Sequence, residues 1–147
     1  FMGDTGSMLI GTVCAILAIS FIEMNHHIQT PPDYIFQAAP AIAVGILILP
    51  LYDTVRVFVQ RVVRGRSPFS PDKTHIHHLL LDLGMSHMKA TFVLLAVNMF
   101  FIIGVVVFNS FGTAMLLSIE LVLMFLFTYF LQRILQKRDR DNSHLAA

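Results

Sequence analysis

Two acidic residues, Asp4 and Asp53, lie close to the ends of long apolar segments. An ionisable side chain at membrane depth usually faces a polar cavity and tends to be functional. Asp4 stands between Gly3 and the Thr5-Gly6 pair, and its carboxylate suits Mg²⁺ held jointly with other ligands and substrate phosphates. Two structural alternatives stay open, because Asp4 could cap the first helix and Asp53 could pair with Arg56.

A histidine-rich stretch, His75-Ile76-His77-His78, forms the second candidate site. Imidazole N–H groups, the N-terminus of a short helix and nearby cations all favour phosphate binding. The nearby cations are Arg64, Arg66 and Lys73. A zinc site is an alternative, because His75, His78 and Asp82 fall at helical spacing on one face. A solvated loop without a ligand is the other alternative.

The composition indicates an all-α polytopic membrane protein. Of the 147 residues, 56% are hydrophobic and 13% are charged, which is too apolar for an ordinary soluble domain. A helix needs about 20 residues to cross the hydrocarbon core. We expect one membrane domain over residues 1–147 with four transmembrane helices, at residues 8–22, 38–51, 90–108 and 113–131.

The distribution of lysine and arginine predicts the topology. These residues gather in the loop 53–89 and in the tail 132–147, whereas the connections 23–37 and 109–112 carry none. The positive-inside rule therefore makes the loop and the tail cytoplasmic. It also places Asp4 and Asp53 at the cytoplasmic ends of their helices, in the same shallow layer of the bilayer.

The loop 53–89 is expected to contain two helices. Valine and phenylalanine recur at helical spacing over residues 55–64, which predicts an amphipathic helix leaving the membrane past a kink at Pro50. A shorter helix would follow, capped by Asp72 or Thr74, and stop at Gly84.

Two polar residues, Asn98 and Glu120, fall inside the last two apolar segments. Polar side chains in membrane helices commonly hydrogen-bond across a helix pair, and we expect these two to do so. The alternative is a proton or solute path in a non-enzymatic membrane subunit or transporter.

Three stretches of the sequence together resemble the polyprenyl-phosphate N-acetylhexosamine-1-phosphate transferase family (glycosyltransferase family 4) of bacterial membranes. They are Phe1-Met2-Gly3-Asp4-Thr5-Gly6-Ser7, Pro50-Leu51-Tyr52-Asp53-Thr54 and the stretch from Ser67 to Leu80. The His-Ile-His-His form resembles the branch of the family that starts O-antigen, enterobacterial-common-antigen-like or teichoic-acid linkage polymers.

The resemblance implies a Mg²⁺-dependent reaction at the cytoplasmic face of the bacterial inner (plasma) membrane. Undecaprenyl phosphate attacks the β-phosphate of a UDP-N-acetylhexosamine, with GlcNAc the expected sugar, and UMP leaves. Asp4 matches the family's metal-binding aspartate. Catalytic roles are expected for Asp4, Asp53 and His75. Contacts to the nucleotide-sugar are expected from His75, His77 and His78, and contacts to its diphosphate from Arg64, Arg66 and Lys73.

The sequence also departs from the family pattern. The family has an adjacent acidic pair on an earlier loop and an Asn/Asp-rich motif after it, and neither occurs in these 147 residues. We therefore expect the chain to hold the last four helices of a longer transferase and to be inactive alone. A lipid bilayer is an expected partner and nucleic acid is not, and a homodimer is left open. Asp4-Thr5-Gly6-Ser7 also matches the active-site string of pepsin-like proteases, but the apolar helical run after it disfavours that soluble β fold.

Overall fold

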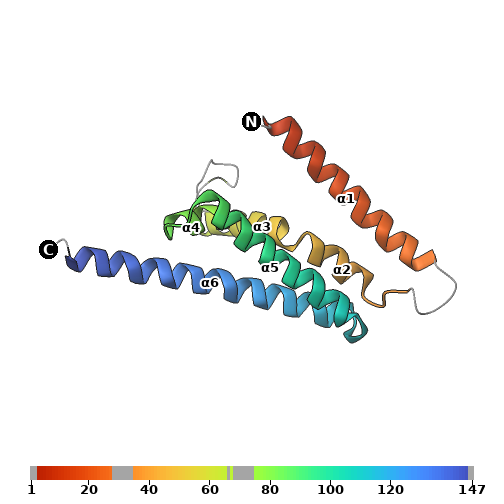
Figure 1. The fold of residues 1–147 in the computed structure, drawn as a ribbon. Coiled ribbons are helices and arrows are strands. Elements are labelled where there is room, and N and C mark those ends of the chain that lie inside the picture. Colours follow the sequence, from red (N-terminus) through yellow and green to blue (C-terminus); the bar gives the residue numbers. More distant parts are fainter. Residues whose placement is uncertain (1–2, 28–34, 66, 68–74, 146–147) are drawn as a thin grey trace.

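The computed structural model describes residues 3–27, 35–65, 67 and 75–145 of the chain, and these residues form helices and no strands. The all-α prediction is therefore confirmed. The helices are α1 (Gly3–His27), α2 (Ala39–Ile46), α3 (Ile48–Val63), α4 (Ile76–Asp82), α5 (His87–Val107), the 3₁₀ turn η2 (Asn109–Phe111) and α6 (Thr113–Leu145). Figure 1 shows their arrangement, in which α5 and α6 are joined through η2 and α2 and α4 each contact both of them.

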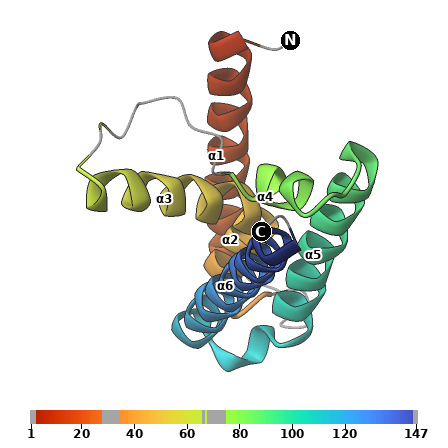
Figure 2. The same ribbon diagram turned by 90° about the vertical axis from the view of Figure 1, so that its left-hand side faces the viewer.

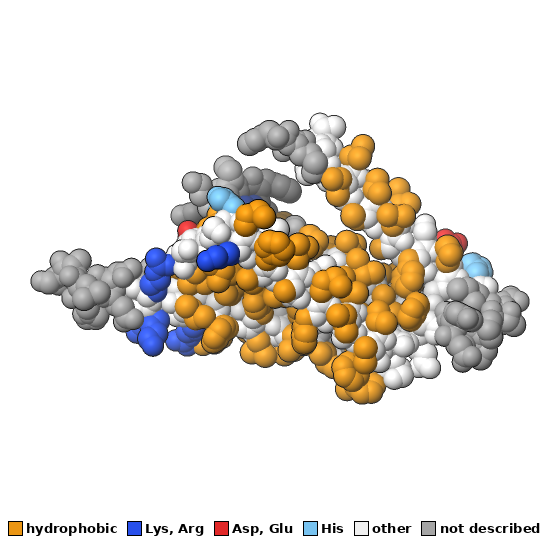
Figure 3. Space-filling view, in the orientation of Figure 1, with side chains coloured by type: hydrophobic (Ala, Val, Ile, Leu, Met, Phe, Trp, Pro, Cys, Tyr) orange, Lys and Arg blue, Asp and Glu red, His pale blue; other side chains and the backbone are white. Residues whose placement is uncertain are grey.

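Three helices in the described ranges are long and apolar enough to cross a membrane: Thr5–His27, His87–Val107 and Thr113–Arg138. The α2–α3 pair is a fourth crossing if its two bent halves form one span. Large apolar side chains cover the outer faces of these helices (Figure 3), as expected where lipid replaces water. The polytopic membrane fold predicted from the composition is confirmed.

The break between α2 and α3 lies at Leu47, where the helix axis turns by 74°. The predicted kink at Pro50 is therefore placed three residues too late. Pro50 lies in the first turn of α3, and a proline ring has no N–H to donate and clashes with the carbonyl four residues earlier. That carbonyl belongs to Ile46, and it accepts a hydrogen bond from Asn98 Nδ2 at 3.3 Å. Neither carboxyl oxygen of Glu120 has a hydrogen-bond partner among the described residues, so the predicted bond between Asn98 and Glu120 is wrong.

Helix α2 lies against α1, α5 and α6. Its buried residues include Ala39, Ala41, Ala43 and Gly45, and small side chains allow helices in membranes to approach closely. A second cluster of buried apolar side chains joins α3, α4, α5 and α6. Its members are Ile48, Ile76, Leu80, Ala90, Phe101, Met124 and Leu131.

The apolar cluster fixes the short helix α4 at the end of the α5–α6 pair. Figure 2 shows α4 beside the start of α3, whereas the far end of α3 points away from α5 and α6. The N-terminal end of α1 stands apart from α3 and α4 in both ribbon views (Figures 1 and 2). The fold therefore brings the start of α3 and the histidine helix together at one end of the bundle.

Candidate active site

Asp53, in α3, contacts the N-terminus of α4 with both oxygens of its carboxylate. Oδ2 lies 2.9 Å from Nδ1 of His75, and Oδ1 accepts the backbone N–H of Ile76 at 3.1 Å. Oδ1 also accepts a bond from Nη2 of Arg56 at 3.4 Å. The first N–H groups of a helix have no partner within it, and negative charge is favoured there. A carboxylate from another helix thus caps α4.

The start of α4 differs from the prediction. His75, with extended backbone, is the residue before the first helical turn. The predicted caps Asp72 and Thr74 lie outside the described residues. A local cap is the sequence prediction because Asp and Thr commonly accept the first N–H groups of a helix. In the structure Asp53 of α3 accepts the N–H of Ile76 instead. The predicted end of the helix is confirmed, since α4 ends at Asp82 and Gly84 takes a positive φ of 84°.

The bond to Asp53 determines which ring nitrogen of His75 is left for a ligand. An ionised carboxylate only accepts hydrogen bonds, so Nδ1 carries the proton in the 2.9 Å contact. Nε2 is then the ring atom that can meet a substrate. The side chain of His75 is 44% exposed and that of Asp53 is 19% exposed, so the carboxylate is largely enclosed while the imidazole remains accessible.

The two other histidines of the motif lie in the first turn of α4. The ring of His77 stacks on that of His87, with centroids 5.7 Å apart and planes at 28°. The ring of His78 meets His77 edge-on at 6.1 Å. Sequence reasoning missed His87, which begins α5. The signal was the Gly84 turn and the Ser86 N-cap, because a tight turn between two helices returns the chain toward the first.

A cavity of about 200 Å³ adjoins this cluster. Its lining combines one carboxylate and one imidazole with apolar side chains, and consists of Leu49, Pro50, Asp53, Ile76, His77 and Leu94. Such a lining suits a ligand that carries both a polar group and an apolar chain.

The far end of α4 is held by α6. Arg138 Nη1 donates to the carbonyl of Asp82, the last residue of α4, at 3.1 Å. A cation at a helix C-terminus is favourable because it meets unpaired carbonyls. Gly84 lies under the same guanidinium, since an added Cβ there would be 3.2 Å from Nη1. Helix α4 is therefore fixed at one end by Asp53 and at the other by Arg138.

The structure does not bring every predicted residue to this cluster. Arg64 caps the far end of α3, about 16 Å along the helix axis from Asp53 at 1.5 Å per residue. Arg66 and Lys73 lie outside the described residues, and so does the side chain of Asp4. The roles predicted for these four residues stay predictions.

Among the described residues, no group of three or more His, Cys, Asp or Glu side chains could hold a metal ion. The zinc alternative built on His75, His78 and Asp82 gains no support, because His75 precedes the helix and its Nδ1 bonds Asp53.

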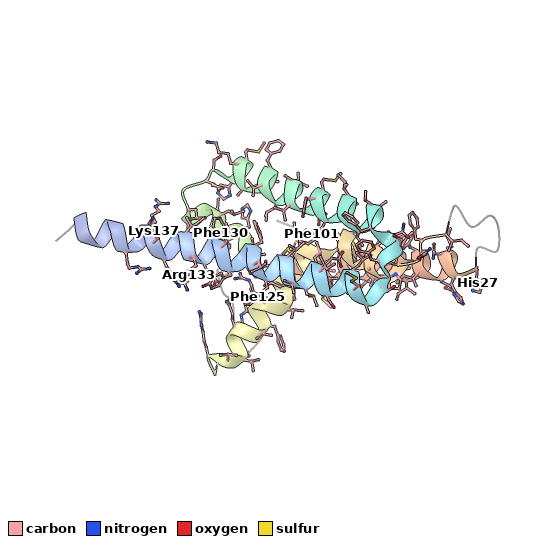
Figure 4. The ribbon with its side chains drawn as sticks, turned by 90° about the horizontal axis from the view of Figure 1, so that it is seen from below. His27, Phe101, Phe125, Phe130, Arg133 and Lys137 are labelled. Carbon is pink, nitrogen blue, oxygen red and sulfur yellow. The ribbon has the colours of Figure 1, made fainter. Side chains whose placement is uncertain are left out.

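Basic side chains gather at the same end of the molecule as α4. Figure 3 shows lysine and arginine there, and Figure 4 places Arg133 and Lys137 at this end of α6, with His27 at the opposite end of the molecule. A charge asymmetry of this kind is typical of a protein with one orientation in the bilayer.

Comparison with known proteins finds several related transferases. The chain is 32% identical over 133 residues to the decaprenyl-phosphate N-acetylglucosaminephosphotransferase of Mycolicibacterium smegmatis, a match that covers 87% of this chain and 33% of that protein. It is 35% identical over 138 residues to the undecaprenyl-phosphate alpha-N-acetylglucosaminyl 1-phosphate transferase of Salmonella typhi, covering 94% of this chain and 35% of the relative. The protein of that name from Haemophilus influenzae is 38% identical over 91 residues, covering 61% of this chain and 23% of its own.

The chain thus spans about a third of the length of the first two relatives. No protein-family model matches it, and no solved structure matches it significantly. The match to the Salmonella typhi relative nevertheless covers 94% of this chain, so it includes Asp53 and the histidines of the motif. The chain belongs to the polyprenyl-phosphate N-acetylhexosamine-1-phosphate transferase family and corresponds to one part of its longer members.

Proposed function

We propose that this chain supplies part of the site that transfers N-acetylglucosamine-1-phosphate from UDP-GlcNAc to undecaprenyl phosphate, with release of UMP. The site faces the cytoplasm at the bacterial inner membrane and serves cell-envelope polysaccharide synthesis. The names of the relatives support the polyprenyl acceptor and the sugar-phosphate group. The observation that carries the proposal is the contact between Asp53 and His75, which fixes a histidine helix at the basic end of the bundle.

In the proposed reaction an oxygen of the acceptor phosphate attacks the β-phosphorus of UDP-GlcNAc. The bond from this phosphorus to the bridging oxygen breaks, and UMP leaves with the electron pair. Positioning and electrostatic stabilisation supply most of the catalysis in phosphoryl transfer. The Nδ1 contact to Asp53 holds the His75 ring in one orientation, so that Nε2 can accept a proton from the acceptor phosphate.

The cavity beside Asp53 suits the acceptor end of this reaction. Its polar walls are Asp53 and His77, and the remaining lining, including Leu49 and Leu94, is apolar. A phosphate carried by a polyprenyl chain has the same two chemical parts. His77 would meet the phosphate, while the apolar side chains would contact the first carbons of the chain.

Mg²⁺ is part of the proposal through Asp4, and it would neutralise diphosphate charge when bound. The described side chains do not form a metal site by themselves. Both oxygens of Asp53 already accept bonds from His75, Ile76 and Arg56. The metal would therefore be held by Asp4 and by ligands beyond this cluster.

The proposal is tested by UMP release in membranes. The chain is expressed alone, or joined to the segment of the Salmonella typhi relative that it does not match. We expect UMP from UDP-GlcNAc only with the joined protein and only when undecaprenyl phosphate and Mg²⁺ are present. UMP release by the joined protein without the acceptor lipid, or no release with every component present, would contradict the proposal.

A further inference from the structure

His87, the first residue of α5, contacts the histidine motif, although the proposed transfer gives it no role. Its ring stacks on that of His77, with centroids 5.7 Å apart and planes at 28°. Unlike His75, His77 has no side-chain hydrogen bond within the described part of the chain. The torsion that turns a histidine ring is soft, so ring contacts are what orient His77, and offset stacking of this kind is attractive.

The same face of α5 carries His87 and a wall of the cavity beside Asp53. Leu94 of α5 and His77 of α4 both line that cavity of about 200 Å³. His87 and Leu94 are seven residues apart, which places them on one face of the helix. Ala90 lies between them on this face and is fully buried, and α4 and α5 are in contact. The stack is therefore continuous with the packing that forms the cavity.

The connection between α4 and α5 fixes the position of His87. Gly84 takes a positive φ of 84° and donates its N–H to the carbonyl of Leu81 at 2.8 Å. Two residues later, Ser86 caps α5 by accepting the N–H of Lys89 at 3.4 Å. Because His87 follows this cap directly, its backbone is held by the start of a 21-residue helix. The two stacked rings thus belong to two helices whose ends are both fixed.

We propose that His87 is a positioning residue for the acceptor phosphate. It holds the ring of His77 toward the cavity, where an imidazole N–H meets the phosphate of the polyprenyl lipid. This role rests on the proposed function, in which His77 is a polar wall of the acceptor site. A ring that is already oriented loses less freedom when the ligand binds, so the stack should favour binding of the lipid without touching it. The stack needs a flat ring at position 87 and no particular nitrogen.

The test is UMP release by the joined protein at saturating UDP-GlcNAc and varied undecaprenyl phosphate. His87→Ala should raise the KM for undecaprenyl phosphate about two- to tenfold, the ratio that the usual strength of one aromatic pair predicts. The rate at saturating lipid and the KM for UDP-GlcNAc should change little. If His87 only supported the helix that follows His75, the saturated rate would fall instead, and that result would overturn the role of His87.

Two further variants separate the ring from the rest of the residue. His87→Phe keeps a flat ring without nitrogen, so its KM for the lipid should be close to that of the unmodified protein. Met88→Ala is the matched control, because Met88 lies in the same turn of α5 and is 68% exposed; both KM values should be unchanged. A phenylalanine variant as poor as His87→Ala, or an equal rise in Met88→Ala, would contradict positioning by the stack.

A double-mutant cycle shows whether His87 acts through His77. His77→Ala removes the phosphate contact and should itself raise the KM for undecaprenyl phosphate. Adding His87→Ala to this protein should cause no further rise, because the ring that it positions is gone. An equal rise in the presence and absence of His77 would overturn the proposed role.

Binding of geranyl phosphate, a short polyprenyl phosphate, separates this role from the transfer reaction. Equilibrium dialysis against the joined protein in detergent, corrected for detergent alone, gives its Kd. His87→Ala should raise this Kd by the same factor as the KM. Weaker binding by His87→Ala, together with no UMP from the unmodified protein, would contradict the proposed function and support the role of His87. Equal binding by the two proteins would overturn that role, whatever the UMP result.

Discussion

The carboxylate of Asp53 lies 2.9 Å from Nδ1 of His75, although the two residues are 22 positions apart in the chain. The other carboxylate oxygen accepts the N–H of Ile76. One side chain therefore orients the imidazole and caps the helix that carries the rest of the histidine motif. This contact joins the two motifs that the sequence analysis treats as separate.

Asp53→Asn should lower transferase activity of the joined protein by about 10- to 100-fold, the usual cost of losing a group that orients a functional histidine. An amide can still accept the Ile76 N–H, but its NH₂ group would favour the opposite tautomer of His75. The measurement is the rate of UMP release at saturating UDP-GlcNAc. Asp82→Asn is the matched control, because Asp82 is exposed at the other end of α4. Equal effects of the two substitutions would argue against an orienting role for Asp53.

Arg138→Gln should loosen the C-terminal end of α4. The guanidinium donates to the carbonyl of Asp82, and loss of one hydrogen bond of this kind costs about 0.5–1.5 kcal/mol. Amide hydrogen exchange at residues 80–84 should accelerate by about two- to tenfold. Lys137→Gln removes the neighbouring charge and should leave this exchange unchanged. Unaltered exchange in Arg138→Gln would show that α6 does not hold α4.

Asn98→Leu should destabilise the bend between α2 and α3, because the Ile46 carbonyl loses its donor. The bond is exposed, so its loss should cost about 0.5–1.5 kcal/mol, the usual net contribution of a hydrogen bond. Pro50→Ala returns a backbone N–H that can bond this same carbonyl, so the double variant should recover part of the loss. Thermal unfolding in detergent gives the four stabilities of this double-mutant cycle. Additive losses would contradict a shared carbonyl.

Gly45→Ala should destabilise the fold by about 1–3 kcal/mol, the usual cost of overpacking a core. The added methyl would lie 2.5 Å from Glu120 Oε1 and 2.9 Å from Val105 Cγ1. Gly11→Ala on α1 is the control, since a Cβ there has no atom within 4 Å. Alanine should stabilise that helix by about 0.5–1 kcal/mol relative to glycine. A gain in stability from both substitutions would show that the Glu120 side chain does not pack against Gly45.

The membrane spans and the amphipathic part of α3 follow from local patterns in the sequence. Apolar run length, helical spacing over 55–64 and the glycine at position 84 each report on a few neighbouring residues. The sequence predicts the bend in the right segment but at the wrong residue, because a proline disrupts the carbonyl four positions before it. Pro50 therefore affects the chain at Ile46, and the break appears at Leu47.

The long-range contacts could not be predicted from the sequence. Asp53 had Arg56 as a local candidate partner, and His75 had Asp82. Only the folded structure, in which α4 packs against α5 and α6, shows that Asp53 also pairs with His75. The same holds for Asn98 and Glu120, which looked like partners on adjacent helices. A backbone carbonyl freed by Pro50 takes the bond from Asn98, and no periodicity in the sequence reports on that geometry.

We propose that His75, held by Asp53, acts in sugar-phosphate transfer. The most direct test is UMP release from UDP-GlcNAc by the joined protein carrying His75→Ala, with undecaprenyl phosphate and Mg²⁺ present. Loss of a positioned acid–base or phosphate-binding group should lower the rate by about 10²–10⁴-fold. His87→Ala, at the neighbouring exposed histidine, is the control and should have a smaller effect. A His75→Ala protein that releases UMP at the unmodified rate would contradict the account.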